Sequence, residues 1–495
     1  MKRIFTFILI LALCLPLVCC AKTDAPVPTA GPNGVTAGPD GVTAAPASTD
    51  PDATPGPYIP GPFDPETDYD NRYAAYHDCA MVDTEEAYYF FKDGFIRYYD
   101  KIMEEEGYLC PKPECLHGEK RPNAGCNAYA TVNAGSLTYY EGQLWWVGDK
   151  GTGRSFAIYR MNLDGTGKEL VYDFEYEGYS RGLIQYFFHR GRIYWSRTDQ
   201  EIINTQAFDT ASFGYIGLDD FEIHTVAVRR SFINPQPTIR FAGDSAYFFV
   251  SYDDIDPDDD IPDGQADYDA YIEFLHAHRP TDEILRMDSA MEEPVTVYLD
   301  DEDGDYWGFY GFGIAQDGTI YFQSSGELED PDQPYEYGVN EYVIEIFKVG
   351  ADGKKERVLE LTDPDGNHYF PIFMDGNLIL GMNSEFAGAK GYIVHSIWLL
   401  DYSGNTLYRG ELPLAYRAKY TGANHRFDDY WSCWATESEL MFCFTEGYSN
   451  AGPHGSDMCY YDFVKYEITP DGLVEVFLGH CRDHFASGDD TLRDF

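Results

Sequence analysis

The chain of 495 residues carries 84 acidic against 35 basic residues, a formal net charge of −49, and 16% of its residues are aromatic. This excess of negative charge repels phosphate backbones and anionic headgroups, so it argues against a nucleic-acid partner and against electrostatic attachment to membranes. The length would fit two or three domains or one long repeat fold, and the abundant Tyr and Phe residues favour β-strands.

The N-terminus has the organisation of an export signal. Two basic residues precede an apolar stretch, residues 4–18, which is too short for a comfortable transmembrane helix. The following run LVCCA, residues 17–21, resembles a bacterial lipobox, which implies a signal peptide of residues 1–20 and a lipid on Cys20. The chain would then be anchored to the outer face of a bacterial cytoplasmic membrane. Cys19 stands where a small residue is usual, so ordinary cleavage after Ala21 is the alternative.

A spacer follows the signal. Residues 21–67 are rich in Pro, Gly, Ala, Thr and Asp and contain the duplication TAGPNGV and TAGPDGV. Because the segment has almost no apolar bulk to bury, we expect a disordered linker with polyproline character. The folded part is expected at residues 68–485, with a short C-terminal tail at 486–495.

A small cassette, a tight turn followed by an apolar-aromatic run, recurs seven times. Its first apolar residues are Ala87, Leu144, Ile193, Ala246, Ile320, Leu378 and Leu440. The clearest copy contains four strand-like segments, SLTYYEG, QLWWVGDKG, SFAIYRMNLDG and TGKELVYDF, separated by Gly/Asp turns. Four antiparallel strands repeated radially form a β-propeller, so we predict an all-β fold of seven four-stranded blades, with six or eight as alternatives.

Two motifs carry a family resemblance. The run IYWS at residues 193–196 resembles a YWTD signature, and IYRMNLDG at residues 158–165 resembles its strand-turn partner. The chain is therefore similar to the TolB-like and YWTD-like propellers of secreted and lipid-anchored bacterial proteins. This resemblance implies a fold and an interaction role, and it supplies no catalytic residues.

The predicted loops divide the propeller into a plain and an elaborated face. Turns between first and second strands are short, whereas the loops between second and third strands are long, at residues 197–211, 253–280, 325–340 and 446–457. The long connection 104–133 falls on the same face. Because binding residues concentrate on loops carried by a rigid scaffold, we expect the elaborated face to be functional.

The 253–280 insertion has two halves. In the first half, Asp256, Asp258 and Asp260 have the alternate spacing of calcium loops, but Ile261 occupies the position where such a loop needs Gly. A solvated charge run is therefore favoured over calcium. The second half, Ala266 to His278, has apolar residues at helical spacing and predicts a short amphipathic helix on the rim.

The most specific constellation is Cys110, Cys115, His117 and Cys126. Three thiols and an imidazole match the ligands of a tetrahedral zinc in number and type, although the spacing is not a standard zinc pattern. A structural zinc site, disulfides in an exported protein, and packed free thiols remain open alternatives. Four protein ligands leave no open position for catalysis.

The other cysteines of the folded part suggest a role in ring closure. All the cysteines of the folded part lie in the first or last predicted blade, which a closed propeller makes neighbours; the others are Cys79, Cys433, Cys443, Cys459 and Cys481. We therefore hypothesise that they reinforce the junction between these two blades.

The sequence contains no G-x-S-x-G elbow, no H-E-x-x-H and no phosphate loop. No catalytic or cofactor-binding residue is therefore predicted, and a non-enzymatic role is favoured. Two functions stay open: an interaction module that binds a protein or small ligand, and a carbohydrate-active or glycan-binding propeller. Acids and exposed Trp residues at the channel mouth would favour the second.

Overall fold

The computed structural model describes residues 61–482 with gaps, the longest at 75–80, 118–124, 176–183, 301–311, 326–342, 363–369, 414–424 and 449–456. The predicted signal peptide, Cys20 and the tail 486–495 lie outside the described residues. Within them, no helix is long and apolar enough to cross a bilayer.

The described strands form seven antiparallel sheets, each built from four strands that are consecutive in the sequence. The first three sheets are β1 (Met81–Asp83), β2 (Ala87–Lys92), β3 (Phe95–Asp100) and β4 (Glu105–Tyr108); β5 (Thr138–Tyr140), β6 (Gln143–Asp149), β7 (Ser155–Asn162) and β8 (Glu169–Glu175); and β9 (Gln185–His189), β10 (Arg192–Ile203), β11 (Gln206–Gly217) and β12 (Ile223–Ser231).

The other four sheets follow in the same order. They are β13 (Thr238–Ala242), β14 (Ser245–Tyr252), β15 (Thr281–Asp288) and β16 (Val295–Asp300); β17 (Phe312–Ile314), β18 (Ile320–Ser325), β19 (Val343–Val349) and β20 (Lys355–Thr362); β21 (Phe370–Met374), β22 (Leu378–Ala387), β23 (Tyr392–Asp401) and β24 (Thr406–Glu411); and β25 (His425–Ala435), β26 (Glu439–Tyr448), β27 (Asp457–Thr469) and β28 (Gly472–Arg482). Two helices complete the described elements, η1 (Asn71–Ala74) and α2 (Tyr268–Ala277).

Each repeated cassette is the turn before a sheet's second strand together with the start of that strand. The seven apolar residues fall at the first or second position of β2, β6, β10, β14, β18, β22 and β26. In two of the turns, Glu141-Gly142 and Arg190-Gly191, both residues have positive φ. Such two-residue turns match the right-handed twist of the strands they join, which explains the glycine at the second position.

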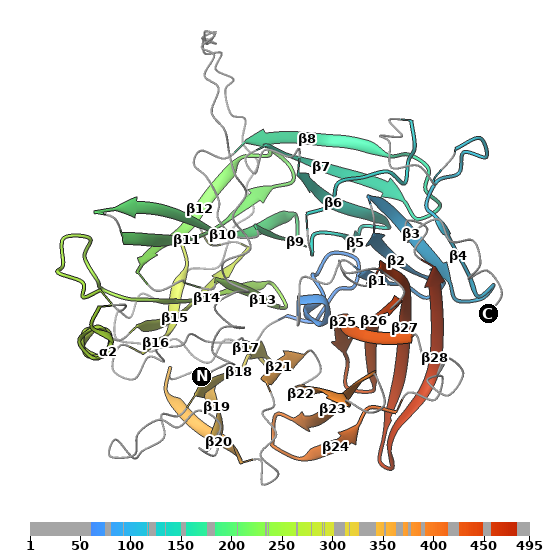
Figure 1. Ribbon diagram of the computed structural model, residues 1–495. Coiled ribbons are helices and arrows are strands. Elements are labelled where there is room, and N and C mark those ends of the chain that lie inside the picture. The colour runs from blue at the N-terminus through green and yellow to red at the C-terminus, as the bar shows by residue number, and fades with distance from the viewer. Residues whose placement is uncertain are drawn as a thin grey trace, which may run out of the picture. The chain divides into compact units, whose positions relative to one another are not determined.

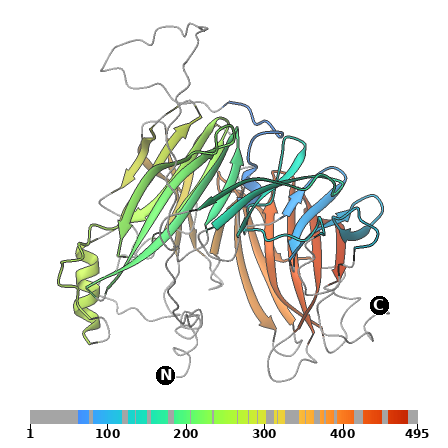
Figure 2. The same ribbon diagram turned by 90° about the horizontal axis from the view of Figure 1, so that it is seen from above.

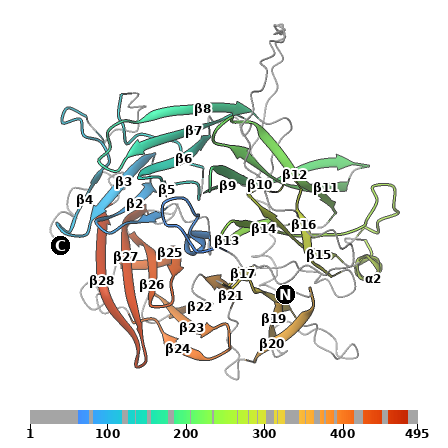
Figure 3. The same ribbon diagram turned by 180° about the vertical axis from the view of Figure 1, so that it is seen from behind.

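The sheets surround a common centre, with first strands innermost and fourth strands outermost (Figures 1 and 3). First strands of successive sheets contact one another, as β1 does β5, β5 does β9 and β17 does β21. The apolar core lies between the faces of neighbouring sheets; for example, Trp146 and Leu144 pack with Val82 and Ile96 of the preceding sheet. The predicted all-β propeller class is confirmed.

One predicted loop is wrong. Residues 197–211 form most of a hairpin, because β10 pairs with β11 from Arg192 opposite Gly217 to Ile203 opposite Gln206. Several residues in the outer half of β10 are polar and half-buried or exposed. This part of the hairpin therefore has the composition of a loop, which explains the wrong prediction. Likewise, the connection predicted from residue 104 begins only after β4, which pairs with β3. The predicted loop 325–340 lies outside the described residues from 326 onward.

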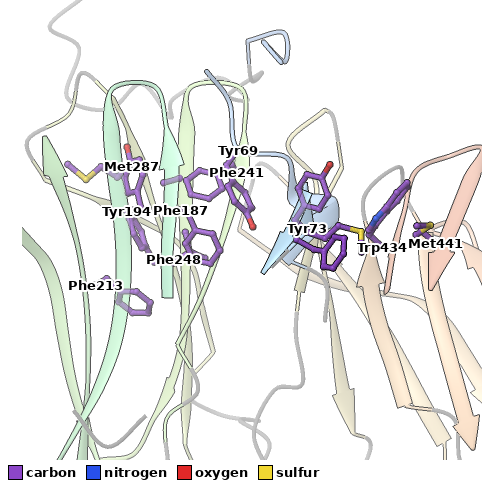
Figure 4. Packing of buried hydrophobic residues seen from close by; sticks show 14 of the residues in the cluster. Tyr69, Tyr73, Phe187, Tyr194, Phe213, Phe241, Phe248, Met287, Trp434 and Met441 are labelled. Atoms are coloured by element: carbon purple, nitrogen blue, oxygen red, sulfur yellow. The ribbon is translucent and has the colours of Figure 1, made fainter. Parts of the chain in front are cut away.

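Residues 61–74, here called the central segment, lie against the first-to-second-strand turns and then near the axis. Their backbone accepts N–H groups of Glu141 and Arg190 through Glu66 and Thr67, so contacts with the sheets begin before the predicted domain start at residue 68. Figure 4 shows Tyr69 and Tyr73 of this segment between aromatic residues of the surrounding sheets. Helix η1 contacts β13, β21 and β25, three innermost strands.

The first and last sheets meet through side chains. Because each described sheet uses four consecutive strands, no strand is exchanged between β1–β4 and β25–β28. Instead, the Phe463 ring lies 5.1 Å from that of Phe90 and 6.2 Å from that of Tyr88. The central segment also contacts both sheets, since the Tyr73 hydroxyl accepts the Asp83 N–H at 2.9 Å and its ring lies 6.4 Å from that of Trp434.

Candidate metal centre and elaborated face

The four predicted ligands converge. One ligand atom from each of Cys110, Cys115, His117 and Cys126 lies within 4.8 Å of the other three. Cys110 follows β4 at the start of the connection to the second sheet, and Cys126 is buried at its far side. Cys110, Cys115 and Cys126 form no disulfide with one another.

Aromatic and apolar side chains surround this cluster. Cys126 packs with Phe95 and Ala128, both almost fully buried. The His117 ring stacks on that of Tyr108 at 4.6 Å and 15°, and its Nε2 is buried without a hydrogen-bond partner among the described residues. An imidazole nitrogen in this position is available to a metal ion.

The thiols differ in acidity. Burial by itself would raise the pKa of Cys110, but a hydrogen bond with His117 and the backbone N–H groups of Lys112 and Asn127 outweigh it and lower this pKa to about 6. Burial, reinforced by the hydrogen bond with Cys115, raises the pKa of Cys126 to about 12. The cluster therefore already stabilises one thiolate, as a metal-binding set of thiols requires.

The connection that carries the cluster is fixed to the second sheet. Asn127 Nδ2 donates to the Gly165 carbonyl at 2.7 Å, and Lys168 Nζ donates to the Tyr129 carbonyl. Gly165 has φ +79°, and a Cβ there would lie 2.7 Å from the Leu109 carbonyl oxygen. Gly165 is thus required both by its backbone conformation and by the close approach of the connection.

A second group of candidate ligands was missed by the sequence analysis. Asp220, Glu222 and His224 also bring one ligand atom each within 4.8 Å of one another, in the turn before β12 and at its start. The two carboxylates are exposed, and Asp220 Oδ1 accepts the Glu222 N–H at 2.9 Å. The turn itself explains why these side chains lie close together, so we assign no metal to this group.

The elaborated face carries a small satellite core. It joins the end of the β10–β11 hairpin to the 253–280 insertion, and we call it the hairpin–helix lobe; its apolar members are Ile203, Phe208, Phe232, Ile255, Ile261, Tyr271, Phe274 and Leu275. The predicted amphipathic helix is confirmed as α2, whose N-terminus is capped by Asp267 through the Ala270 N–H. Asn204 Nδ2 donates to the Pro257 carbonyl at 3.0 Å and ties the hairpin to the insertion.

The lobe and the central segment lie on opposite faces. The lobe is built on connections between second and third strands, whereas the central segment contacts turns between first and second strands. Figure 2 shows α2 and the central segment at opposite ends of the sheets.

The surface of the lobe combines negative charge with exposed apolar side chains. The exposed acids of its insertion are Asp254, Asp256, Asp258, Asp259, Asp260, Asp263, Asp267, Asp269 and Glu273. Ile202 is 64% and Tyr268 63% exposed. In the acidic run, Asp256 Oδ1 accepts the Asp258 N–H and Asp259 Oδ2 accepts the Asp256 N–H. These carboxylates shape turns, and calcium remains the less favoured interpretation.

The central segment is held by a buried ionic and aromatic cluster. Asp68 accepts from Arg190 Nη2 at 2.8 Å, and the Tyr69 N–H donates to Nδ1 of His189 at 3.1 Å. Tyr69 stacks edge-on against Phe187 at 4.9 Å. The channel entrance on the plain face is therefore occupied by the chain itself. The tryptophans with described side chains are buried or half-buried, so they form no exposed stacking platform.

A pH effect follows from His189. Burial lowers its pKa from 6.5 to about 4 in the folded protein, although Asp68 opposes this shift. Between these values the unfolded chain binds a proton that the folded protein does not, so stability present above pH 6.5 is lost as the pH falls toward 4. We expect a loss of up to about 3 kcal/mol, measured by urea unfolding across this range. A His189→Gln variant, which keeps an acceptor for Tyr69, should lack this component; an unchanged pH profile would contradict the assignment.

Comparisons with known proteins are consistent with remote similarity only. No protein-family model matches the chain, and no curated protein matches it significantly. Among solved structures, the acylaminoacyl peptidase of Pyrococcus horikoshii aligns at 11% identity and a TM-score of 0.39, over 83% of this chain and 54% of its own. The chain thus spans about half the length of that peptidase.

Two further solved structures align over most of their own length. The β-propeller domain of the Trilobed protease from Pyrococcus furiosus aligns at 9% identity and a TM-score of 0.38, over 79% of this chain and 92% of its own. The polysaccharide lyase Uly1 aligns at 8% identity and a TM-score of 0.38, over 80% and 91%. Identities and TM-scores this low do not indicate a shared function with any of these three proteins.

Proposed function

We propose that this protein is an exported propeller of the TolB-like and YWTD-like kind, with each of its seven sheets as one blade, tethered by a lipid on Cys20. It acts as a binding module for an extracellular protein through the hairpin–helix lobe. The observation that carries this proposal is the occupied channel entrance: the central segment lies against the innermost strands on the plain face, and within the described part of the chain the lobe is the elaborated surface that remains for a ligand.

The lobe lies on the face opposite the start of the described chain, and its surface suits a protein partner. The described chain begins at residue 61 on the plain face, where Gly61 lies against Gly243 and Arg190, so the attachment side of the folded part does not cover the lobe. Ile202 and Tyr268 supply apolar contact area and the eight exposed aspartates surround it with negative charge. A partner with apolar pockets and a basic rim is complementary to this surface.

A pair of photo-cross-linking variants tests the proposal on anchored protein in intact cells. A cross-linking residue at position 202 is expected to capture an extracellular protein, whereas one at position 103, which is 65% exposed in the turn between β3 and β4 on the plain face, is not. Binding of the captured partner should weaken at least about tenfold between about 50 mM and about 500 mM salt. Capture only at position 103, or salt-independent binding of a glycan, would overturn it.

A further inference from the structure

We propose that Cys110, Cys115, His117 and Cys126 form a structural zinc site that fastens the connection between the first and second sheets. This proposal is independent of the ligand bound by the lobe. Its starting observation is the convergence of four ligand atoms within 4.8 Å of one another, from residues up to 16 positions apart. Around tetrahedral zinc, with Zn–S bonds of about 2.3 Å, ligand atoms lie about 3.5–4 Å apart, so small side-chain rotations complete the geometry.

The number of thiols favours a metal over disulfides. Three cysteines lie together, so a disulfide within the cluster would leave one thiol unpaired beside it. Cys443, the other described cysteine side chain, packs in the separate apolar cluster around the central segment, together with Phe90 and Phe463. A Cys₃His set uses all three thiols and the imidazole at once. Three S–Zn bonds and one N–Zn bond form while the thiol protons leave to solvent.

Neighbouring side chains hold the His117 imidazole in a fixed orientation, as the ligands of metal sites are held. His117 is stacked on Tyr108, and the guanidinium of Arg97 lies 5.3 Å from the centre of the same Tyr108 ring. Arg97 is itself nearly fully buried and paired with Glu106 of β4. This stack holds the ring in one orientation, and the buried Nε2 provides a nitrogen without a protein hydrogen-bond partner among the described residues. Supporting contacts of this kind orient the ligands of metal sites.

The charge of the complex can be balanced locally. Zn²⁺ with three thiolates and a neutral imidazole carries a net charge of −1. The Lys168 ammonium interacts electrostatically with Cys126 and Cys110, and backbone N–H groups of Lys112 and Asn127 donate to the Cys110 sulfur. Such donors stabilise thiolates in a partly buried site.

The site would reinforce a small apolar cluster. Apart from the isolated bridge of Tyr129 with Phe95, the described residues of the connection between β4 and β5 form no regular strand pairing. In the apolar cluster around the four ligands, the buried described residues are Phe95, Cys126 and Ala128, whereas Leu109, Ala130 and Leu137 of the connection pack into the separate core between the first and second sheets. A metal crosslink supplies the stability that so small a cluster cannot.

The decisive measurement is the metal content of the exported full chain, purified without chelators. We expect one zinc per chain, falling below about 0.1 in Cys110→Ser and Cys126→Ser variants and unchanged in Cys443→Ser and Glu222→Gln, which alter the other described thiol and the second ligand group. Cobalt substituted for zinc should show thiolate charge-transfer absorption and the intense visible bands of a tetrahedral site.

Two further results separate the alternatives. A His117→Cys variant should keep one metal per chain and change the cobalt spectrum, which shows ligation without relying on variants that fail to fold. Chelation should accelerate cleavage by a Glu-specific endoprotease after the exposed Glu114, between the first two cysteines of the cluster, at least tenfold. Peptide mapping that finds a disulfide between two of the three cysteines, or full-length folded protein with three free thiols and no metal, would overturn the proposal.

Discussion

Replacing Trp434 by alanine is expected to lower the free energy of unfolding by about 3–5 kcal/mol, because this is the cost of removing a large, fully buried aromatic side chain. Trp434 is 0% exposed and lies on an innermost strand of the last sheet. It packs against Tyr73 of the central segment, and the Arg72 guanidinium lies 5.1 Å from the centre of its ring. Its loss would open a cavity where the chain fills the axis.

Two matched variants make this prediction specific. Trp434→Phe should cost much less, about 1 kcal/mol, because the indole Nε1 is buried without a hydrogen-bond partner among the described residues, so no hydrogen bond is lost. Trp398→Ala removes the same side chain from a half-buried position on β23 and should cost clearly less than Trp434→Ala. Equilibrium urea unfolding measures all three. A Trp434→Ala cost below that of Trp398→Ala would show that the axis is not packed as described.

Replacing Phe463 by alanine is expected to cost about 3–5 kcal/mol and to loosen the junction between the first and last sheets. Phe463 on β27 is 0% exposed and packs on Phe90 and Tyr88 of β2. Because no described strand is shared between these two sheets, side-chain packing must supply the closure that backbone hydrogen bonds provide within a sheet.

Hydrogen exchange gives this second prediction its control. In Phe463→Ala, amide protection should fall in β1–β4 and β25–β28 more than in β13–β16 on another part of the ring. Val476→Ala on β28, where the side chain is 51% exposed, should change stability by less than about 0.5 kcal/mol. Uniform loss of protection in all sheets would mean that the ring unfolds as one unit and that the junction is not its weak point.

Predictions based on neighbouring residues agreed best with the structure. The cassette places a turn and an apolar run within ten residues, and hairpin pairing follows from this alternation because turn geometry sets the register. The cluster from Cys110 to Cys126 spans 17 residues, so a compact connection brings its ligands together without help from distant elements. Helix α2 was visible for the same reason, through apolar residues at helical spacing.

Polar hairpin extensions were harder to recognise. The outer part of β10 has few buried residues, and the composition of TDQE and NTQ is typical of loops. Its strand structure is supported by continuous pairing from the base of the hairpin and by the lobe that packs on its end. The strand propensity of the hairpin residues cannot predict this stabilisation, because the residues that pack on the hairpin belong to the insertion of the next sheet.

The sequence by itself determined the all-β class, the repeated hairpin unit and the set of metal-ligand candidates, since each depends on residues close together in the chain. Only the tertiary structure decided how the ring is closed and what occupies its entrance. Asp68 pairs with Arg190, which lies 122 positions further along the chain. Tyr73 packs against Trp434, which lies in the last of the seven sheets. Residues 61–74 contain few apolar side chains and form no long strand or helix, so their burial depends on a cavity that exists only once the surrounding sheets have assembled.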